Sequence, residues 1–344
     1  RANTTGASNV GVGYRALYAN TTAANNTAVG YQALTANTTG QNNTALGSNA
    51  LSSNTTAGRS VAIGSEALAA LQDGAENVAV GQQAMKTETS GQRSVAVGYY
   101  ALATQNSTGA GTNVYNTAVG ALAGQVLTTG LNNTLIGGVA GDALTDADHN
   151  VAIGYAALGT DTLGSRSVAI GRAALNAQNF TSATDTYNTA VGYHAGVAVT
   201  TATRNTLVGG LTGDAITTGA RNTALGALAL SEETAGAYST AVGYQALAVQ
   251  NNTGGGNIYN TAVGYQAGFS ITTGVQNTLI GGAAGDALTD ADYNVALGVS
   301  SLAQDTLGSK STALGFGTLA TQNFTSATDS FNTAVGYHAG VSVT

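Results

Sequence analysis

The sequence predicts an all-β fold, a parallel β-solenoid or β-roll of about 19 coils, and three observations support this prediction. A five-residue phrase of the form Asn/Ser, Thr/Val, Ala, Val/Ile/Leu, Gly recurs 19 times. Its closing glycines are 17 residues apart almost everywhere. Apolar residues within the phrase alternate with a period of two, which is typical of a strand. A 17-residue unit is too short for a helix pair or a propeller blade, so it fits one turn of a solenoid.

The composition agrees with a repetitive chain that buries many small groups. Charged residues make up 8% of the 344 residues, against roughly 25% in an ordinary domain. Pro, Cys and Trp are absent, while 48 residues are Gly. A disordered polar segment is poor in aliphatic residues, whereas 43% of this chain is hydrophobic. We therefore expect a folded chain without disulfides or thiolate metal sites.

The charge of the chain argues against two classes of partner. The net charge is −7, and no basic run is present, so we expect no nucleic-acid binding. No apolar stretch approaches the ~20 residues that cross a bilayer, so we expect no membrane insertion. Because the chain starts at Arg1 and not at Met, we expect a fragment or a processed product of an extracellular protein.

Longer units interrupt the regular spacing once in every four coils. The long units are those that end at Gly120, Gly192, Gly264 and Gly336, and each contains a short insertion relative to the other units. Three short units and one long unit make a super-repeat, and the super-repeats span 121–192, 193–264 and 265–336. We expect one continuous solenoid domain over 1–344. The residues that represent its structural repeat are Asn26, Val29, Gly30, Ile63, Gly64, Gly120, Gly192, Gly264 and Gly336.

The phrase also predicts two strand faces. The residue before the glycine and the residue two positions earlier favour strands and share one face. Ala lies between them, so the opposite face is small and suits close approach by another chain. Ala33-Leu34 and its equivalents indicate a second short strand, and Asn37 with its equivalents indicates a ladder of aligned amides.

The phrase NTAVG at 26–30, with SVAIG at 60–64 and NTAVG at 116–120, resembles the head repeats of trimeric autotransporter adhesins. The fuller phrase NTAVGYQAL at 26–34, followed by NTTG at 37–40, resembles repeat regions of phage tail-fibre-like proteins that carry a C-terminal self-cleaving intramolecular chaperone. This resemblance covers nearly the whole chain. It implies a trimeric fibre whose chaperone domain is released after folding.

Few residues of the chain are suited to catalysis or metal binding. His149, His194 and His338 lie inside repeats, so repeated surface positions are the favoured interpretation. Oxygen-rich turns can bind Ca²⁺, although we favour solvated carboxylates and predict no metal or other cofactor. The weak metal candidates are Asp142, Asp146, Asp148, Asp286, Asp290 and Asp292.

The long units are the best candidates for a binding surface, because extra residues in a regular solenoid bulge outward. Aromatic and amide side chains there suit carbohydrate or contacts between fibres. The candidates are Asn179, Phe180, Tyr187, Asn323, Phe324 and Phe331. A tolerated insertion without a function is the alternative.

The sequence therefore favours a structural shaft or adhesive segment of an extracellular or virion fibre, without enzymatic activity. Its expected partners are other copies of itself, as a homotrimer or an end-to-end filament, and a cell-surface glycan. An ice-binding solenoid is the alternative, based on the paired threonines at 21–22, 38–39 and 55–56. An enzyme with a cleft between chains is a third hypothesis, and it would need clustered carboxylates.

Overall fold

A computed structural model of the chain describes all residues except 1–2, 108, 110 and 344. The described residues form strands, turns and loops without a helix, and so they contain no helix that could span a bilayer. The strands build a parallel β-solenoid of about 19 turns, which confirms the predicted fold class. The chain divides into two compact units: Arg1–Ser167 with Asn179–Asp185, and Val168–Gln178 with Thr186–Thr344.

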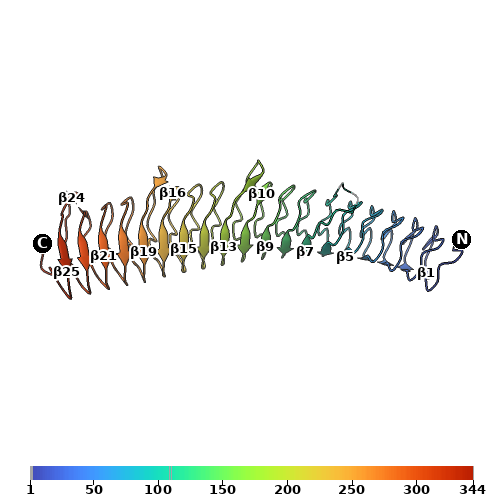
Figure 1. Cartoon of the computed structure of the whole chain (residues 1–344), viewed down its shortest axis with the longest axis horizontal. Helices are drawn as coiled ribbons and strands as arrows, with labels where there is room; N and C mark the ends of the chain where they lie inside the picture. The colour runs from blue at the N-terminus through green and yellow to red at the C-terminus, as the bar shows by residue number, and fades with distance from the viewer. Residues whose placement is uncertain (1–2, 108, 110, 344) are drawn as a thin grey trace. The chain divides into compact units, whose positions relative to one another are not determined.

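Each unit has one long parallel ladder in which every turn contributes a three-residue strand (Figure 1). The strands of unit 1 are β1 (Val10–Val12), β2 (Thr27–Val29), β3 (Thr44–Leu46), β4 (Val61–Ile63), β5 (Val78–Val80), β6 (Val95–Val97), β7 (Thr117–Val119), β8 (Thr134–Ile136) and β9 (Val151–Ile153). Those of unit 2 are β11 (Val168–Ile170), β13 (Thr189–Val191), β14 (Thr206–Val208), β15 (Thr223–Leu225), β17 (Thr240–Val242), β19 (Thr261–Val263), β20 (Thr278–Ile280), β21 (Val295–Leu297), β23 (Thr312–Leu314) and β25 (Thr333–Val335).

The register places equivalent residues of the phrase beside one another. Thr27 pairs with Thr44, Ala28 with Ala45 and Val29 with Leu46. The same register continues across the long units, since Val95 pairs with Thr117 although an inserted segment lies between them. The period of the sequence is therefore the period of the ladder, and an insertion does not shift it.

The face that points into the solenoid is the alanine face, which corrects the expectation that it packs against another chain. Ala28, Ala45 and Ala62 are fully buried within the single chain. The flanking strand residues point outward, and Leu46 remains 46% exposed. A methyl group fills the interior in most turns, although Leu135, Leu207 and Leu279 are fully buried at the same position.

The glycine that ends each phrase is required by both conformation and space. Gly64 has φ of 132°, and a Cβ atom there would lie 2.4 Å from the carbonyl oxygen of Gly81 in the next turn. A side chain at this position would force the two turns apart.

The Ala-Leu pair after the glycine lies in a turn, so the predicted second strand is wrong. Ala33 and Leu34 are both fully buried, but Leu34 adopts a left-handed conformation with φ of 49°. The Asn37 N–H then donates to the Leu34 carbonyl at 3.4 Å. This compact turn buries two neighbouring side chains, whereas a strand would have pointed them to opposite sides.

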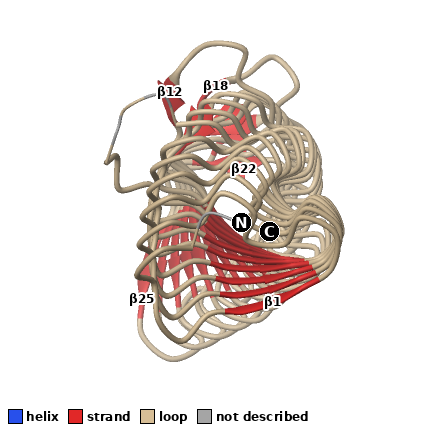
Figure 2. Cartoon of the chain, turned by 90° about the vertical axis from the view of Figure 1, so that its right-hand side faces the viewer, coloured by secondary structure: helices blue, strands red, loops and turns tan. Residues whose placement is uncertain are grey.

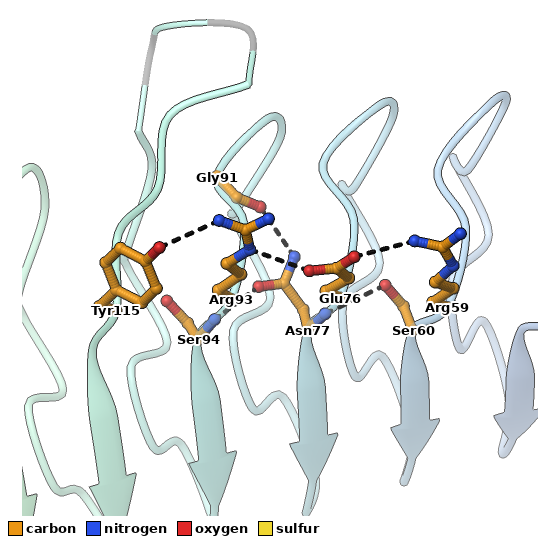
Figure 3. Close-up of polar contacts among 8 residues, drawn as sticks. All are labelled: Arg59, Ser60, Glu76, Asn77, Gly91, Arg93, Ser94 and Tyr115. Atoms are coloured by element: carbon orange, nitrogen blue, oxygen red, sulfur yellow. Dashed lines mark hydrogen bonds and ion pairs between the residues drawn. The ribbon is translucent and has the colours of Figure 1, made fainter.

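A ladder of buried amides runs beside the strands and connects neighbouring turns wherever Asn occupies the position. The Asn43 N–H donates to Asn26 Oδ1 at 2.9 Å, and Asn26 Nδ2 donates to the Gly40 carbonyl at 2.9 Å. Asn77 repeats this pattern with Ser94 N and the Gly91 carbonyl (Figure 3). Each amide thus satisfies a buried backbone donor and a buried backbone acceptor, which would otherwise be costly to bury.

The predicted ladder at Asn37 also exists, but only in the first turns. Asn37 Nδ2 donates to Asn20 Oδ1 at 2.9 Å, and Asn54 Nδ2 donates to Asn37 Oδ1 at 3.1 Å. In later turns the equivalent position holds fully buried Leu71 and then Glu88.

The extra residues of the long units form loops outside the regular turn, as the sequence predicts. Three of these loops are fastened by short parallel pairs: β10 (Gly164–Ser165) with β12 (Thr184–Asp185), β16 (Gly236–Ala237) with β18 (Gly256–Asn257), and β22 (Gly308–Ser309) with β24 (Thr328–Asp329). In the first long unit, Gln92 and Asn113 form a single bridge. Figure 2 shows β12, β18 and β22 away from the strands of the main ladder.

Candidate functional site

Most of the exposed large apolar side chains of both units lie in the strands of the main ladder or directly after the closing glycine. Along each strand, more exposed residues alternate with buried ones, so equivalent exposed residues form rows across neighbouring turns. The aliphatic row includes Leu46 and Leu225, which are 46% and 48% exposed. The aromatic row follows the closing glycine, and stacked pairs in it include Tyr14 with Tyr31 and Tyr244 with Tyr265. These rows offer a repeated surface and not one enclosed pocket.

A third row, which we call the edge row, holds the residue just before each buried Asn or Ser of the amide ladder. All its members adopt a left-handed conformation, which turns their side chains outward. In unit 1 they are Ser8, Asn25, Asn42, Arg59, Glu76, Arg93, Tyr115, Asn132, His149 and Arg166. In unit 2 they are Tyr187, Arg204, Arg221, Tyr238, Tyr259, Gln276, Tyr293, Lys310 and Phe331.

The edge row concentrates positive charge in a chain that is acidic as a whole. It holds six of the ten Lys and Arg residues but one of the 17 Asp and Glu residues, Glu76. In unit 1 the signs alternate: Glu76 accepts hydrogen bonds from Arg93 at 2.9 Å and from Arg59 at 3.0 Å (Figure 3). The hydrogen bond from Arg93 and, to a smaller extent, the one from Arg59 lower the pKa of Glu76. Arg93 also donates to the Tyr115 hydroxyl at 3.0 Å.

The candidate residues in the long units do not form one common surface. Asn179 and Asn323 are exposed, and each accepts a hydrogen bond from a threonine hydroxyl at 3.2 Å. Tyr187 and Phe331 belong to the edge row and are 48% and 69% exposed. Phe180, however, is only 8% exposed, so its ring fills space and offers little surface to a ligand.

Phe324 occupies the position equivalent to Phe180 and shows where such a ring lies. Its side chain is half-buried and lies over Gly308, where an added Cβ would meet Phe324 Cδ2 at 2.8 Å. In the other two long units, Val114 and Ile258 lie over the equivalent glycines and are likewise buried. Each inserted loop therefore returns one apolar side chain to the core.

Sequence reasoning missed a buried carboxylate at the base of every inserted loop. Glu88, Asp161, Glu233 and Asp305 are all fully buried. Asp305 Oδ1 accepts the N–H groups of Gly308 and Phe324, both at 3.0 Å. Glu233 Oε1 likewise accepts the N–H groups of Gly236 at 2.7 Å and Asn252 at 3.1 Å. These carboxylates fix the start of each loop.

A glutamine in the following turn links each carboxylate to the amide ladder. Gln322 Nε2 donates to Asp305 Oδ2 at 2.5 Å and to Ser311 Oγ at 3.0 Å. Its Oε1 accepts from Asn332 Nδ2 at 2.7 Å. Ser311 has no side-chain amide to continue the ladder to Asn332, and the glutamine supplies these contacts instead. The signal was present in the sequence, because an acidic residue precedes each such glutamine by one regular repeat.

The six aspartates considered as metal ligands are held by the protein itself or lie apart. Thr129 Oγ1 donates to Asp146 at 2.5 Å, and the Leu131 N–H donates to Asp148 at 2.7 Å. Asp290 and Asp292 repeat these contacts with Thr273 and Val275. The described part of the chain contains no group of three or more His, Cys, Asp or Glu side chains that could hold a metal ion.

Asp142 and Asp286 occupy equivalent positions of their repeats, as does Asp214, and all three are half-buried. Burial raises the pKa of all three carboxyl groups, while hydrogen bonds to their own backbone oppose the rise. One buried carboxyl oxygen of Asp214 and one of Asp286 have no hydrogen-bond partner within the described residues. These groups carry a desolvation cost without a compensating contact.

The three histidines contact their ladder neighbours. Asn132 lies 3.5 Å from His149, Arg172 lies 2.7 Å from His194, and the His338 ring packs edge-on against Phe316 at 5.2 Å.

Neither a protein-family model nor a curated protein sequence matches the chain.

Replacing Asp305 with Asn is expected to destabilise unit 2 by about 2–3 kcal/mol, because an NH₂ group would face the donating amide of Gln322. Urea unfolding followed by circular dichroism measures this change, and limited proteolysis should detect cleavage within 323–331. Asp290→Asn is the matched control, because Asp290 is exposed, and its effect should stay within about 0.5 kcal/mol. Equal effects of the two substitutions would contradict the assigned role of Asp305.

The raised pKa values of the buried aspartates predict a dependence of stability on pH. A carboxyl group with a raised folded-state pKa favours folding while it is protonated, so its contribution is lost as the pH rises from about 4 through the folded-state value. The triple variant Asp142→Asn, Asp214→Asn, Asp286→Asn should therefore be more stable than the wild type at pH 7, with a smaller difference at pH 3. Thermal unfolding at both pH values measures this. A triple variant that is less stable at pH 7 would contradict the prediction.

Proposed function

We propose that the chain is a structural and adhesive segment of an extracellular or virion fibre, and that it acts in attachment or fibre assembly without catalysis. One observation carries this proposal: the parallel strands keep the same register through each unit, so equivalent positions of the repeat recur along the exterior. Such an array suits repeated weak contacts with a surface or a neighbour. Catalysis, in contrast, needs one cluster of reactive groups held by partners.

The proposed assembly is a homotrimer, and the structure changes the reason for it. The alanine face is already buried within one chain, so it cannot provide the contact between chains. The exposed aliphatic and aromatic rows are a better contact. Within unit 2 the two rows include Leu225, Leu297 and Tyr265, whose side chains are 48%, 42% and 58% exposed. Monomers rarely expose many large apolar side chains together, and such surfaces are typical of protein–protein contacts.

An end-to-end filament remains a second mode of assembly in this proposal.

The paired threonines that motivated an ice-binding solenoid are less available than expected. Thr21 and Thr38 donate their hydroxyl groups to carbonyls of the next turn at 3.2 and 3.0 Å. Only the second threonine of each pair is then left to order water. We therefore favour the fibre over an ice-binding solenoid.

Light scattering behind a sizing column tests the assembly. The expected mass is three times that of the 33.7 kDa chain. The double substitution Leu225→Lys, Leu297→Lys should yield monomers, because charges would replace apolar side chains in the contact. Val126→Lys is the control, since Val126 is 38% exposed but lies outside the three rows. A monomeric wild type, or a trimer unaffected by the double substitution, would contradict the proposed contact.

A further inference from the structure

The edge row of unit 2 contains two neighbouring arginines without a carboxylate partner in the described chain. Arg204 precedes β14 and Arg221 precedes β15, and these strands pair directly, so the two residues are about 4.8 Å apart along the ladder. Like charges in adjacent positions of a sheet repel each other. Elsewhere in the row, Arg59 and Arg93 share Glu76, and Lys310 pairs with Asp329 at 2.6 Å.

The surroundings of the pair leave its positive charge available to a ligand. The Arg204 side chain is exposed and makes no hydrogen bond, ion pair or ring contact within the described residues. Arg221 donates to the Tyr238 hydroxyl at 2.6 Å and lies 5.2 Å from the centre of that ring. The tyrosine positions this guanidinium without neutralising it.

Aromatic rings and hydroxyl groups flank the two arginines. Tyr187 lies one turn before Arg204, and Tyr238 and Tyr259 occupy the two turns after Arg221, with ring centres 5.2 Å apart. Thr206 and Thr223 are exposed two residues after the arginines, and their hydroxyl groups have no partner in the described chain. The stretch from Tyr187 to Tyr259 covers four steps of the ladder, about 19 Å.

We infer that this stretch of the edge row binds an acidic polysaccharide. Guanidinium groups bind carboxylate and sulfate groups through paired hydrogen bonds. Threonine and tyrosine hydroxyl groups complement sugar hydroxyls, and exposed rings offer an apolar surface to the sugar ring. An acidic polysaccharide would be the ligand in the attachment role proposed above, so this inference rests on that proposed function.

The super-repeat itself provides matched variants. In the next super-repeat, the positions equivalent to Arg204 and Arg221 hold Gln276 and Tyr293, on the same backbone conformation and without charge. The double substitution Arg204→Gln, Arg221→Tyr therefore installs residues that the scaffold already accommodates. The reciprocal double substitution Gln276→Arg, Tyr293→Arg transfers the charged pair one super-repeat along.

Binding to immobilised chain is measured by biolayer interferometry with four probes: dextran sulfate, polygalacturonate, neutral dextran and oligothymidylate. The wild type is expected to bind one or both acidic polysaccharides and to bind neither of the other two. Arg204→Gln, Arg221→Tyr should weaken this binding about tenfold or more, because two charge-assisted contacts are lost. Adding Gln276→Arg, Tyr293→Arg to that variant should restore binding. Arg59→Gln, which removes an exposed arginine paired with Glu76, should leave it unchanged.

Any of three binding results would overturn the inference: no binding of either acidic polysaccharide, equal binding by the Arg204→Gln, Arg221→Tyr variant, or oligothymidylate binding as tight as that of the polysaccharide. Light scattering on the same variant separates this site from fibre assembly. Lost polysaccharide binding with an unchanged mass supports the site. A change in mass would assign the arginines to the contact between chains and would also overturn the inference.

Discussion

The fold depends on one hydrogen-bonding arrangement, the buried amide that connects most turns to the next. A short solenoid turn buries few apolar atoms, and much of its interior wall is backbone. Asn222 shows how this is resolved: its side chain accepts the N–H of Ser239 at 2.8 Å and donates to the carbonyl of Gly236 at 2.9 Å. Without such contacts these buried groups would lack partners, at about 1–3 kcal/mol each. Small alanines and one compact Ala-Leu turn fill the remaining space.

The same constraint accounts for the super-repeat. Where Ser replaces Asn in the ladder before a long unit, a glutamine and a buried carboxylate complete the network, as Gln250 and Glu233 do at 2.8 Å. The apolar side chain that each loop returns to the core is larger where the buried carboxylate side chain is shorter. The shorter Asp305 accompanies Phe324, whereas the longer Glu233 accompanies Ile258. The contacts of an inserted loop with the core are therefore set by the carboxylate and the apolar side chain. The outward residues can vary between super-repeats, as they do at the positions of Arg204 and Arg221.

The sequence was sufficient for the period, the strands and the position of the insertions, because glycine, Asn and β-branched residues each mark one place in the turn. It was not sufficient to orient the strand. A period of two separates two faces but does not say which is inside, and Val29 and Leu46 suggested the wrong one. The Ala33-Leu34 turn was missed because a left-handed leucine has no sequence signature. The carboxylates were missed because acidic residues are rarely fully buried.

The unfolding free energy of Asn222→Ala tests most directly whether the amide ladder holds the fold together. The account predicts a loss of about 2–4 kcal/mol relative to the wild type, because the Ser239 N–H and the Gly236 carbonyl would both lose their partner. Asn222→Ser should cost less, since at the equivalent position Ser60 Oγ accepts the N–H of Asn77 at 3.3 Å. The exposed substitution Thr218→Ala provides the baseline for the same unit. A loss for Asn222→Ala no larger than that of Thr218→Ala would show that apolar packing and the strand ladder suffice, and would contradict this account.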